Sequence, residues 1–279
     1  MRLVYLLCFL LVSPTLADDA ATKISTENIS TAEVAANGER VHRVQSQWQA
    51  GETLVRVLLP TQLDDSKKHR VLFVLPVEAG VERHYGDGLD EIRRLDLHNR
   101  YRLICVAPTF SHLPWFADHP TDPMIRQESY LLRTVLPLIE ERYPVSRERS
   151  GRLLLGFSKS GWGAFSLLLR NPDVFEKAVA WDAPLMMPEP GKYGSGPIFG
   201  SAENFRAYQL TELVRRQAKQ LGPSPRLVHL GYDNFRAEHV GFEALLNELN
   251  VPHVYQSGPQ RKHVWQSGWV EDAVRLLVE

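Results

Sequence analysis

Cysteine is almost absent from this chain. The 279 residues include two cysteines, Cys8 and Cys105. We expect Cys8 to leave with an N-terminal signal segment, so the remaining chain cannot form an internal disulfide. Cys105 lies in the apolar run 103–107, where no charged neighbour would activate it, and we predict a buried, inert thiol. Stability must then come from a hydrophobic core, which roughly 260 residues can bury without covalent staples.

The chain also lacks an excess of one charge and the short motifs of phosphate and metal sites. Lysine and arginine number 32, aspartate and glutamate number 33, and neither sign is clustered, so the sequence predicts no nucleic-acid partner. Neither G-x-x-x-x-G-K-[ST] nor G-x-G-x-x-G occurs, and the ten histidines show no H-E-x-x-H spacing. We therefore predict no phosphate-binding loop and no metal site.

Long apolar runs are confined to the N-terminus. Met1-Arg2 precedes the apolar stretch 3–12, and Thr15-Leu16-Ala17 places small residues before a cut after Ala17. This pattern predicts a cleaved signal peptide over 1–17 and a secreted or periplasmic protein, with an uncleaved anchor as the alternative. No other segment approaches about 20 continuous apolar residues. We therefore expect no stable membrane insertion once the signal is removed.

After the signal peptide we predict a weakly ordered leader over 18–40 and a single domain over 41–279. The domain begins with a hairpin, 41–48 and 52–59, around Ala50-Gly51. Apolar runs with the length of buried strands then alternate with helical patterns. The predicted strands are 71–75, 102–107, 152–155, 176–181, 226–230 and 252–256; the predicted helices are 122–142, kinked at Pro137, 203–221 and 236–249. This order predicts an α/β fold with an N-terminal antiparallel hairpin and a mostly parallel central sheet, covered by helices on both faces. We expect the long irregular segment 183–200 to form a pocket wall or lid.

One hydroxyl lies between small residues where a predicted strand gives way to a helical stretch. The sequence there is Gly156-Phe157-Ser158-Lys159-Ser160-Gly161. A nucleophile elbow follows the pattern G-x-S-x-G, because strand and helix pass closely around a strained serine. Ser160 takes the place of the second glycine. The pattern nevertheless predicts Ser158 as a nucleophile.

A serine nucleophile needs an imidazole to take its proton and a carboxylate to orient that imidazole. Asp233 directly follows the strand 226–230, and His263 ends the loop after the last strand. Ser158, Asp233 and His263 therefore occur in the chain order of an α/β-hydrolase triad. Asp182, after the strand 176–181, and Glu238 remain alternative acids. The pattern around His239 and His253 is more typical of packing histidines.

The oxyanion of an acyl-transfer intermediate needs two N–H donors. We expect one from the backbone of Lys159 and the other from Val77 or Glu78, in the loop after the strand 71–75; a Ser–Lys dyad using the Lys159 side chain is the alternative. Trp115 is predicted to face the substrate. Two further candidates for substrate binding are Trp162, whose residue type is more often found in the core, and Asp182.

The chain resembles the esterase branch of the α/β-hydrolases, which includes esterase D, feruloyl and acetylxylan esterases, enterochelin esterases and the mycolyltransferases. The resemblance lies in Leu155–Ala164 at the elbow and in Asn171-Pro172-Asp173-Val174-Phe175 after the elbow helix. In layout it covers roughly residues 50 to 279. It implies Ser158 as nucleophile, Asp233 as acid and His263 as base. The chain departs from the family pattern at Ser160 and in lacking His-Gly at the oxyanion loop.

These features together predict an exported serine hydrolase. It would cleave carboxylic esters through a Ser-His-Asp triad and an acyl-enzyme intermediate, and would need no cofactor. The substrate would be a small-molecule or carbohydrate-linked ester whose acyl and alcohol groups the sequence does not define. The alternatives are an acyltransferase on the same fold and a catalytically silent α/β-hydrolase that binds carbohydrate or lipid.

Overall fold

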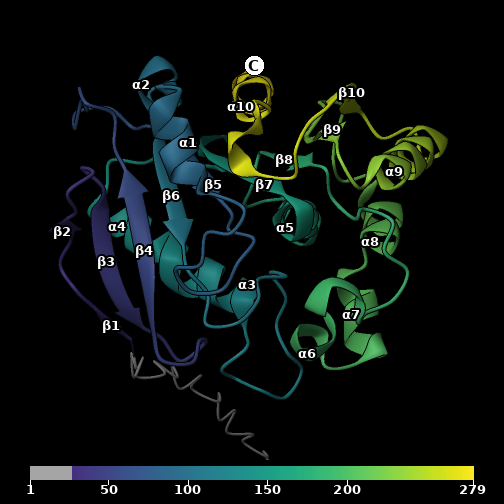
Figure 1. The fold of residues 1–279 in the computed structure, drawn as a ribbon, viewed down its shortest axis with the longest axis horizontal. Helices are drawn as coiled ribbons and strands as arrows, with labels where there is room; N and C mark the ends of the chain where they lie inside the picture. Colours follow the sequence, from purple (N-terminus) through teal and green to yellow (C-terminus); the bar gives the residue numbers. More distant parts are fainter. Residues whose placement is uncertain (1–26) are drawn as a thin grey trace, which may run out of the picture.

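A computed structural model describes residues 27–279 as a ten-stranded sheet with helices on both sides (Figure 1). The strand order is β1-β3-β4-β6-β5-β7-β8-β9-β10, and β2 pairs with β3. The predicted signal peptide, 1–17, and residues 18–26 of the predicted leader lie outside the described residues. Within residues 27–279 we find no helix that is both long and apolar enough to cross a membrane.

The N-terminal side of the sheet is antiparallel. β3 (Arg40–Gln45) and β4 (Glu52–Leu58) form the predicted hairpin, and β4 pairs antiparallel with β6 (Ile104–Pro108). Two short strands, β1 (Asn28–Ile29) and β2 (Glu33–Val34), also pair with β3. The prediction of a weakly ordered leader is therefore wrong over residues 28–34, because backbone pairing with β3 holds this segment on the sheet.

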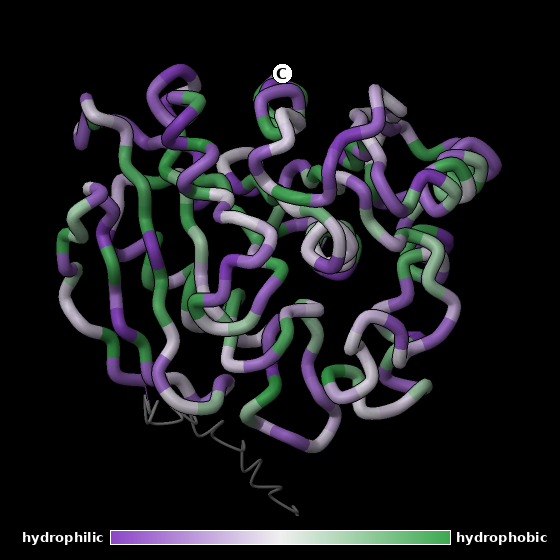
Figure 2. The backbone as a smooth tube through the Cα atoms, in the orientation of Figure 1, coloured by the Kyte–Doolittle hydropathy of each residue, from purple (hydrophilic) through white to green (hydrophobic). Residues whose placement is uncertain are grey.

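The other strands pair in parallel in the order β6-β5-β7-β8-β9-β10, which confirms the predicted sheet. Their bounds are β5 Val71–Val74, β7 Arg152–Phe157, β8 Lys177–Trp181, β9 Leu227–Tyr232 and β10 His253–Gln260. The central strands β5, β6 and β7 are buried along their whole length. Figure 2 shows these strands as largely hydrophobic stretches of the tube. Buried parallel strands of this kind carry continuous apolar runs, which is why the sequence revealed them.

Two hydrophobic clusters lie on the two sides of the sheet. One contains apolar residues of α1 (Gly88–Arg94), α2 (Leu97–Arg100) and α10 (Val270–Val278), and the other contains residues of α5 (Ser158–Arg170), α8 (Leu210–Gln217) and α9 (Arg236–Glu248). The remaining helices are α3 Gln127–Tyr130, α4 Leu136–Arg142, α6 Gly196–Phe199 and α7 Ala202–Tyr208. Short helical turns are η1 Leu131–Val135, η2 Arg149–Gly151, η3 Lys192–Gly194 and η4 Trp265–Ser267.

The helices differ from the prediction at their ends and interruptions. The segment predicted as a helix over 122–142 becomes helical only at Gln127 and contains the π-helical turn η1 just before Pro137. Proline has no N–H for a helical bond, so the preceding turn has to widen or bend. The predicted helix 203–221 is broken at Gln209, whose backbone is extended. The segment 183–200 is not wholly irregular, since it contains η3 and α6.

Candidate active site

Ser158 occupies a sharp turn between β7 and α5. Its φ angle is +52°, in the left-handed region that residues other than glycine rarely adopt, and it is 8% exposed. Glycine at 156 is required because a Cβ there would lie 2.2 Å from the backbone oxygen of Ser160. Strained backbone of this kind persists only where its surroundings fix it, and it concentrates at functional sites. The geometry is that of a nucleophile elbow.

The structure explains why Ser160 is compatible with the elbow. Its hydroxyl accepts a hydrogen bond from the backbone N–H of Phe157 at 3.0 Å and donates one to the Phe157 carbonyl at 2.9 Å. The close passage of helix and sheet falls instead at Gly161, where a Cβ would lie 2.9 Å from the Cβ of Ala183. Ser160 therefore closes the turn with its side chain.

His263 lies against the elbow. It follows β10, and its ring packs against the rings of Phe157 and Tyr85, with centroids 5.1 Å and 5.7 Å away. The ring of Trp181 lies 6.2 Å away. Because Phe157 directly precedes Ser158, these contacts bring the imidazole to the nucleophile turn.

The carboxylate that meets this imidazole belongs to Asp182. The Nδ1 atom of His263 lies 2.6 Å from Oδ2 of Asp182. The prediction that Asp233 orients the ring is wrong, because the Asp233 carboxylate accepts hydrogen bonds from the His263 backbone N–H at 3.1 Å and from the Gln260 side chain at 3.0 Å. Asp233 therefore fixes the path of the loop that carries the histidine.

Asp182 is fully buried and held by the start of α9. The backbone N–H groups of Asn234 and Phe235 donate to its carboxylate, at 3.1 Å and 2.8 Å. Burial by itself raises the pKa of Asp182, but the hydrogen bonds from His263 and from the backbone outweigh burial and leave the pKa below its ordinary value. Asp182 is thus kept ionised. Its φ of +38° is a second strained position at the site.

The alternative acid and bases have structural partners elsewhere. Oε2 of Glu238 accepts from the backbone N–H of Met186 at 2.6 Å. His239 is fully buried, and its Nε2 accepts from the backbone N–H of Ala183 at 2.8 Å. The ring of His253 lies with Nε2 2.6 Å from Glu243. None of the three takes the place of Asp182 or His263.

The loop after β5 lies over the elbow. The Glu78 carboxylate accepts from the backbone N–H groups of His84 and Tyr85, at 2.9 Å and 3.2 Å, so its side chain shapes this loop. Val77 is 2% exposed. The ammonium of Lys159 lies 5.8 Å from the centroid of the Tyr85 ring. Burial lowers the pKa of Lys159 and nearby Glu78 opposes the shift. Within residues 27–279 no hydrogen bond joins the Lys159 ammonium to Ser158, and the ammonium has the Tyr85 ring as its neighbour.

The two tryptophans predicted to face substrate are core residues. Trp115 and Trp162 are both 0% exposed, and their rings meet edge to face with centroids 5.5 Å apart. The segment containing Trp115 folds inward because Gln127 accepts from the backbone N–H groups of Trp115 and Phe116, each at 2.8 Å. The prediction that these two side chains bind substrate is therefore wrong.

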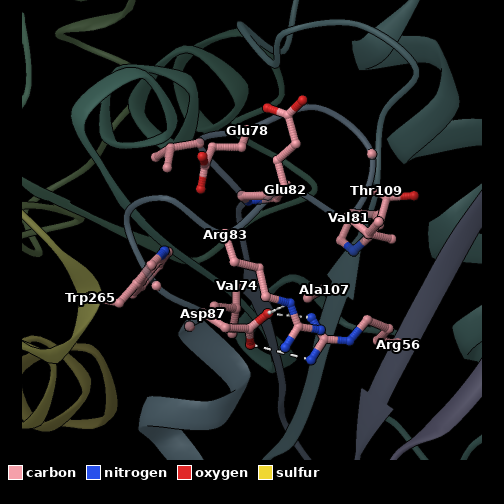
Figure 3. A pocket seen from close by; sticks show the side chains of 16 residues that line it. Arg56, Val74, Glu78, Val81, Glu82, Arg83, Asp87, Ala107, Thr109 and Trp265 are labelled. Atoms are coloured by element: carbon pink, nitrogen blue, oxygen red, sulfur yellow. Dashed lines mark hydrogen bonds and ion pairs between the residues drawn. The ribbon is translucent and has the colours of Figure 1, made fainter.

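A small pocket of about 50 Å³ lies beside the same loop, between it, Arg56 of β4 and the end of β6. Figure 3 shows Arg83, Asp87 and Arg56 meeting at one side of this pocket, with Trp265 and Val74 nearby. The Arg56 guanidinium donates to Asp87 at 2.6 Å and to Glu39 at 2.8 Å. A buried network of ion pairs thus borders the pocket, and through Asp87 it holds the end of the loop that precedes α1.

Sequence reasoning also missed a cluster of histidines around α9. His229, Glu243 and His253 place one ligand-type atom each within 4.8 Å of one another. They come from β9, α9 and β10, so no local spacing connects them. Only the neighbouring positions of the two last strands in the sheet could have indicated their approach.

Comparison with solved structures shows the class to which this fold belongs. An S-formylglutathione hydrolase from Agrobacterium tumefaciens matches with a TM-score of 0.71 and 17% identity, over 90% of this chain and 98% of that one. The fluorophosphonate-binding serine hydrolase F of Staphylococcus aureus matches with a TM-score of 0.67 and 16% identity, over 91% and 99%. A ferulic acid esterase matches with a TM-score of 0.64 and 20% identity, over 91% and 97%. The fold is therefore that of the α/β-hydrolases.

The match to a sequence family covers less of the chain than the matches to solved structures. The family model described as "Putative esterase" matches residues 118–233, which include the elbow and Asp182. Comparison with curated proteins gave no match. The partial match to this esterase family and the α/β-hydrolase fold shared with the solved structures agree with each other, and both include the turn that carries Ser158.

Proposed function

We propose that the chain hydrolyses carboxylic esters through Ser158, His263 and Asp182. The observation that carries this proposal is the 2.6 Å contact between His263 Nδ1 and a buried Asp182 carboxylate, beside a serine on a strained elbow. A carboxylate at Nδ1 places the ring's lone pair on Nε2, the atom that takes the serine proton in such triads. The family match over 118–233, which includes Ser158 and Asp182, supports the roles of these two residues.

In the proposed reaction, Ser158 Oγ attacks the ester carbonyl carbon while its proton passes to Nε2 of His263. The tetrahedral intermediate collapses by breaking the bond to the alcohol oxygen, which leaves with the proton from Nε2. Water then attacks the acyl-enzyme, gives a proton to Nε2, and the second collapse releases the acid and returns the proton to Ser158. The Ser158–His263 bond is not formed among the described residues, and such bonds often close only around substrate.

The backbone N–H of Lys159, in the first turn of α5, is the proposed first oxyanion donor. A helix N-terminus favours developing negative charge at this position. The loop after β5 would supply the second donor from Val77 or Glu78, because it lies over the elbow through Tyr85. Asp182, ionised and fully buried, would stabilise the imidazolium formed at each step.

We further propose that the protein acts outside the cytoplasmic membrane. The support is the sequence of residues 1–17, with a basic start, an apolar stretch and small residues before Ala17. The substrate would be a small-molecule ester, with a carbohydrate-linked ester as one form of it. One solved relative is described as a ferulic acid esterase, which agrees with this class.

The test is turnover of p-nitrophenyl acetate by the chain without its first 17 residues. Ser158→Ala and His263→Ala should each lower kcat by about 10³-fold or more, since loss of a triad member removes most of the catalysis. Ser166→Ala, a change of the same chemistry on the same helix, should keep full activity. Turnover by Ser158→Ala within tenfold of wild type would contradict the assignment of Ser158 as the nucleophile.

A further inference from the structure

We propose that His239 is a positioning residue for Asp182, and that His229 and Glu243 fix the tautomer it needs. His239 does not touch the nucleophile or the imidazole. It acts on the backbone directly after Asp182, through the Ala183 N–H. This inference rests on the proposed function, because it concerns how the acid of that triad is held.

His239 accepts a hydrogen bond from the backbone of Ala183. The backbone N–H of Ala183 points at Nε2 of His239, 2.8 Å away. A backbone N–H can only donate, so Nε2 must carry a lone pair. Burial lowers the pKa of His239 to about 4, with nearby Asp182 opposing the shift, so the ring is neutral at pH 7. Its single proton therefore lies on Nδ1, an assignment made from the hydrogen-bond network.

The proton position on His239 also determines the proton position on His229. Nδ1 of His239 lies 3.2 Å from Nδ1 of His229, a fully buried ring on β9. Because His239 donates there, His229 must accept, and its own proton lies on Nε2. That atom lies 3.3 Å from Oε2 of Glu243, close enough for the negative charge to act on it, although no hydrogen bond joins the two atoms. A carboxylate at this end favours the tautomer that His239 requires.

His253, on the other side of Glu243, also has one nitrogen whose proton can be assigned. Nδ1 of His253 lies 2.7 Å from the carbonyl oxygen of Val251, which can only accept, so this nitrogen carries a proton. Its Nε2 lies 2.6 Å from the same Glu243 oxygen. Glu243 thus lies beside one histidine from each of β9 and β10, at 3.3 Å and 2.6 Å. Two hydrogen bonds, His239 to His229 and Ala183 to His239, and the charge of Glu243 beside His229 therefore connect α9 with the residue after Asp182.

Asp182 needs such support because its backbone is strained. A left-handed conformation costs an ordinary residue on the order of 1–2 kcal/mol, so the neighbouring contacts must hold it. In the described structure those contacts come from α9 and the turn before it: Asn234 and Phe235 on the carboxylate, Glu238 on Met186, and His239 on Ala183. Without the His239 acceptor, the Ala183 N–H would be buried and unpaired.

The same hydrogen-bond order argues against a metal ion at His229, Glu243 and His253. A metal would need the lone pair on Nε2 of His229, which would move that ring's proton to Nδ1. His239 would then have to accept at Nδ1 and carry its proton on Nε2, directly opposite the Ala183 N–H. Metal binding would therefore break the hydrogen bond between His239 and the Ala183 N–H, which holds the backbone next to Asp182.

The experiment compares His239→Leu with His239→Gln. Leucine leaves the Ala183 N–H without an acceptor, whereas the glutamine side-chain oxygen can reach the position of Nε2 and restore the bond. With p-nitrophenyl acetate we expect kcat to fall about tenfold or more in His239→Leu, with KM nearly unchanged, and to recover most of its value in His239→Gln. The acidic limb of kcat/KM should move to lower pH in His239→Leu, because a displaced Asp182 stabilises the imidazolium less.

A proton NMR spectrum separates this inference from the proposed function. The Nδ1 proton of His263, bonded to Asp182, should give a strongly downfield signal in wild type that is lost in His239→Leu and retained in His239→Gln, whether or not the enzyme turns over the chosen ester. Leu246→Ala, another buried change on α9, is the matched control and should lower stability without moving the pH limb or the signal. Two results would overturn the proposal: His239→Leu behaving like Leu246→Ala, or one equivalent of bound zinc that is lost in His253→Ala.

Discussion

At the scale of single residues, the assignment of the acid separates this structure most sharply from its sequence. Asp182 and Asp233 follow adjacent parallel strands, β8 and β9, so both reach the same edge of the sheet. Local pattern does not distinguish them. The structure gives the imidazole to Asp182 and the backbone of the histidine loop to Asp233.

Asp182→Asn should therefore lower kcat by about 10⁴-fold, since an amide favours the wrong imidazole tautomer. Asp233→Asn should cost less than about tenfold, because its side-chain oxygen can still accept from the His263 backbone. Steady-state turnover of both variants at pH 7.5 decides between them. The reverse order of losses would return the acid to Asp233.

Ser160 gives a second residue-scale prediction. Its hydroxyl satisfies the Phe157 backbone inside a fully buried turn, so Ser160→Ala should lower the free energy of unfolding by about 1–2 kcal/mol. Ser166 is the matched control, because its buried hydroxyl has no hydrogen-bond partner among residues 27–279. Urea unfolding should show Ser166→Ala unchanged or stabilised. Equal losses in the two variants would contradict the role of Ser160.

At the scale of elements, α9 does more than cover the sheet. Its buried histidines stay neutral in the fold: burial lowers the pKa of His239 to about 4 and that of His229 well below its ordinary value. Below pH 6.5 the unfolded chain binds protons that the folded chain does not, so stability falls as the pH falls.

The expected loss from His239 alone is about 3 kcal/mol between pH 6.5 and pH 4, at about 1.4 kcal/mol for each tenfold change in proton affinity. Unfolding in urea across this range should show the decline in wild type and a smaller decline in His239→Gln. An identical pH dependence in the variant would show that folding leaves the pKa of His239 unchanged, which would contradict this account.

The N-terminal strands are attached by charge as well as by pairing. Arg56 on β4 joins Glu39, just before β3, to Asp87, whose carboxylate also caps α1 by accepting from the Asp90 N–H at 3.0 Å. Removing one partner of a buried ion pair leaves the other charges uncompensated.

Arg56→Ala should destabilise the fold by about 3–5 kcal/mol, measured by urea unfolding. Arg43→Ala, which removes an exposed pair with Glu52 at 2.8 Å, should cost less than about 1 kcal/mol. Similar losses of stability in the two variants would mean that water reaches the ion pairs of Arg56 with Glu39 and Asp87.

At the scale of the whole molecule, the sequence predicted the sheet well because its strands are apolar runs of strand length. The parallel order from β5 to β10 follows from the alternation of strands and helices. The elbow was predictable for a similar reason: small residues at 156 and 161 are required by close backbone approach. Both features are local in the chain.

What the sequence did not predict depends on contacts between distant segments. Trp115 turned out to be core because Gln127 draws its loop inward, and His229 meets Glu243 and His253 only after three elements assemble. The choice between Asp182 and Asp233 depends on how the loop after β10 returns to the sheet. Such choices are set by packing, which residue patterns do not record.

The central claim is that Ser158 is a nucleophile activated by His263. Labelling with a fluorophosphonate probe, followed by digestion and peptide mass mapping, tests it directly, because the probe bonds to an activated serine oxygen. We predict one equivalent of label on Ser158, none in Ser158→Ala, and strongly slowed labelling in His263→Ala. A label on another serine, or none on Ser158 in the folded wild-type protein, would contradict the account.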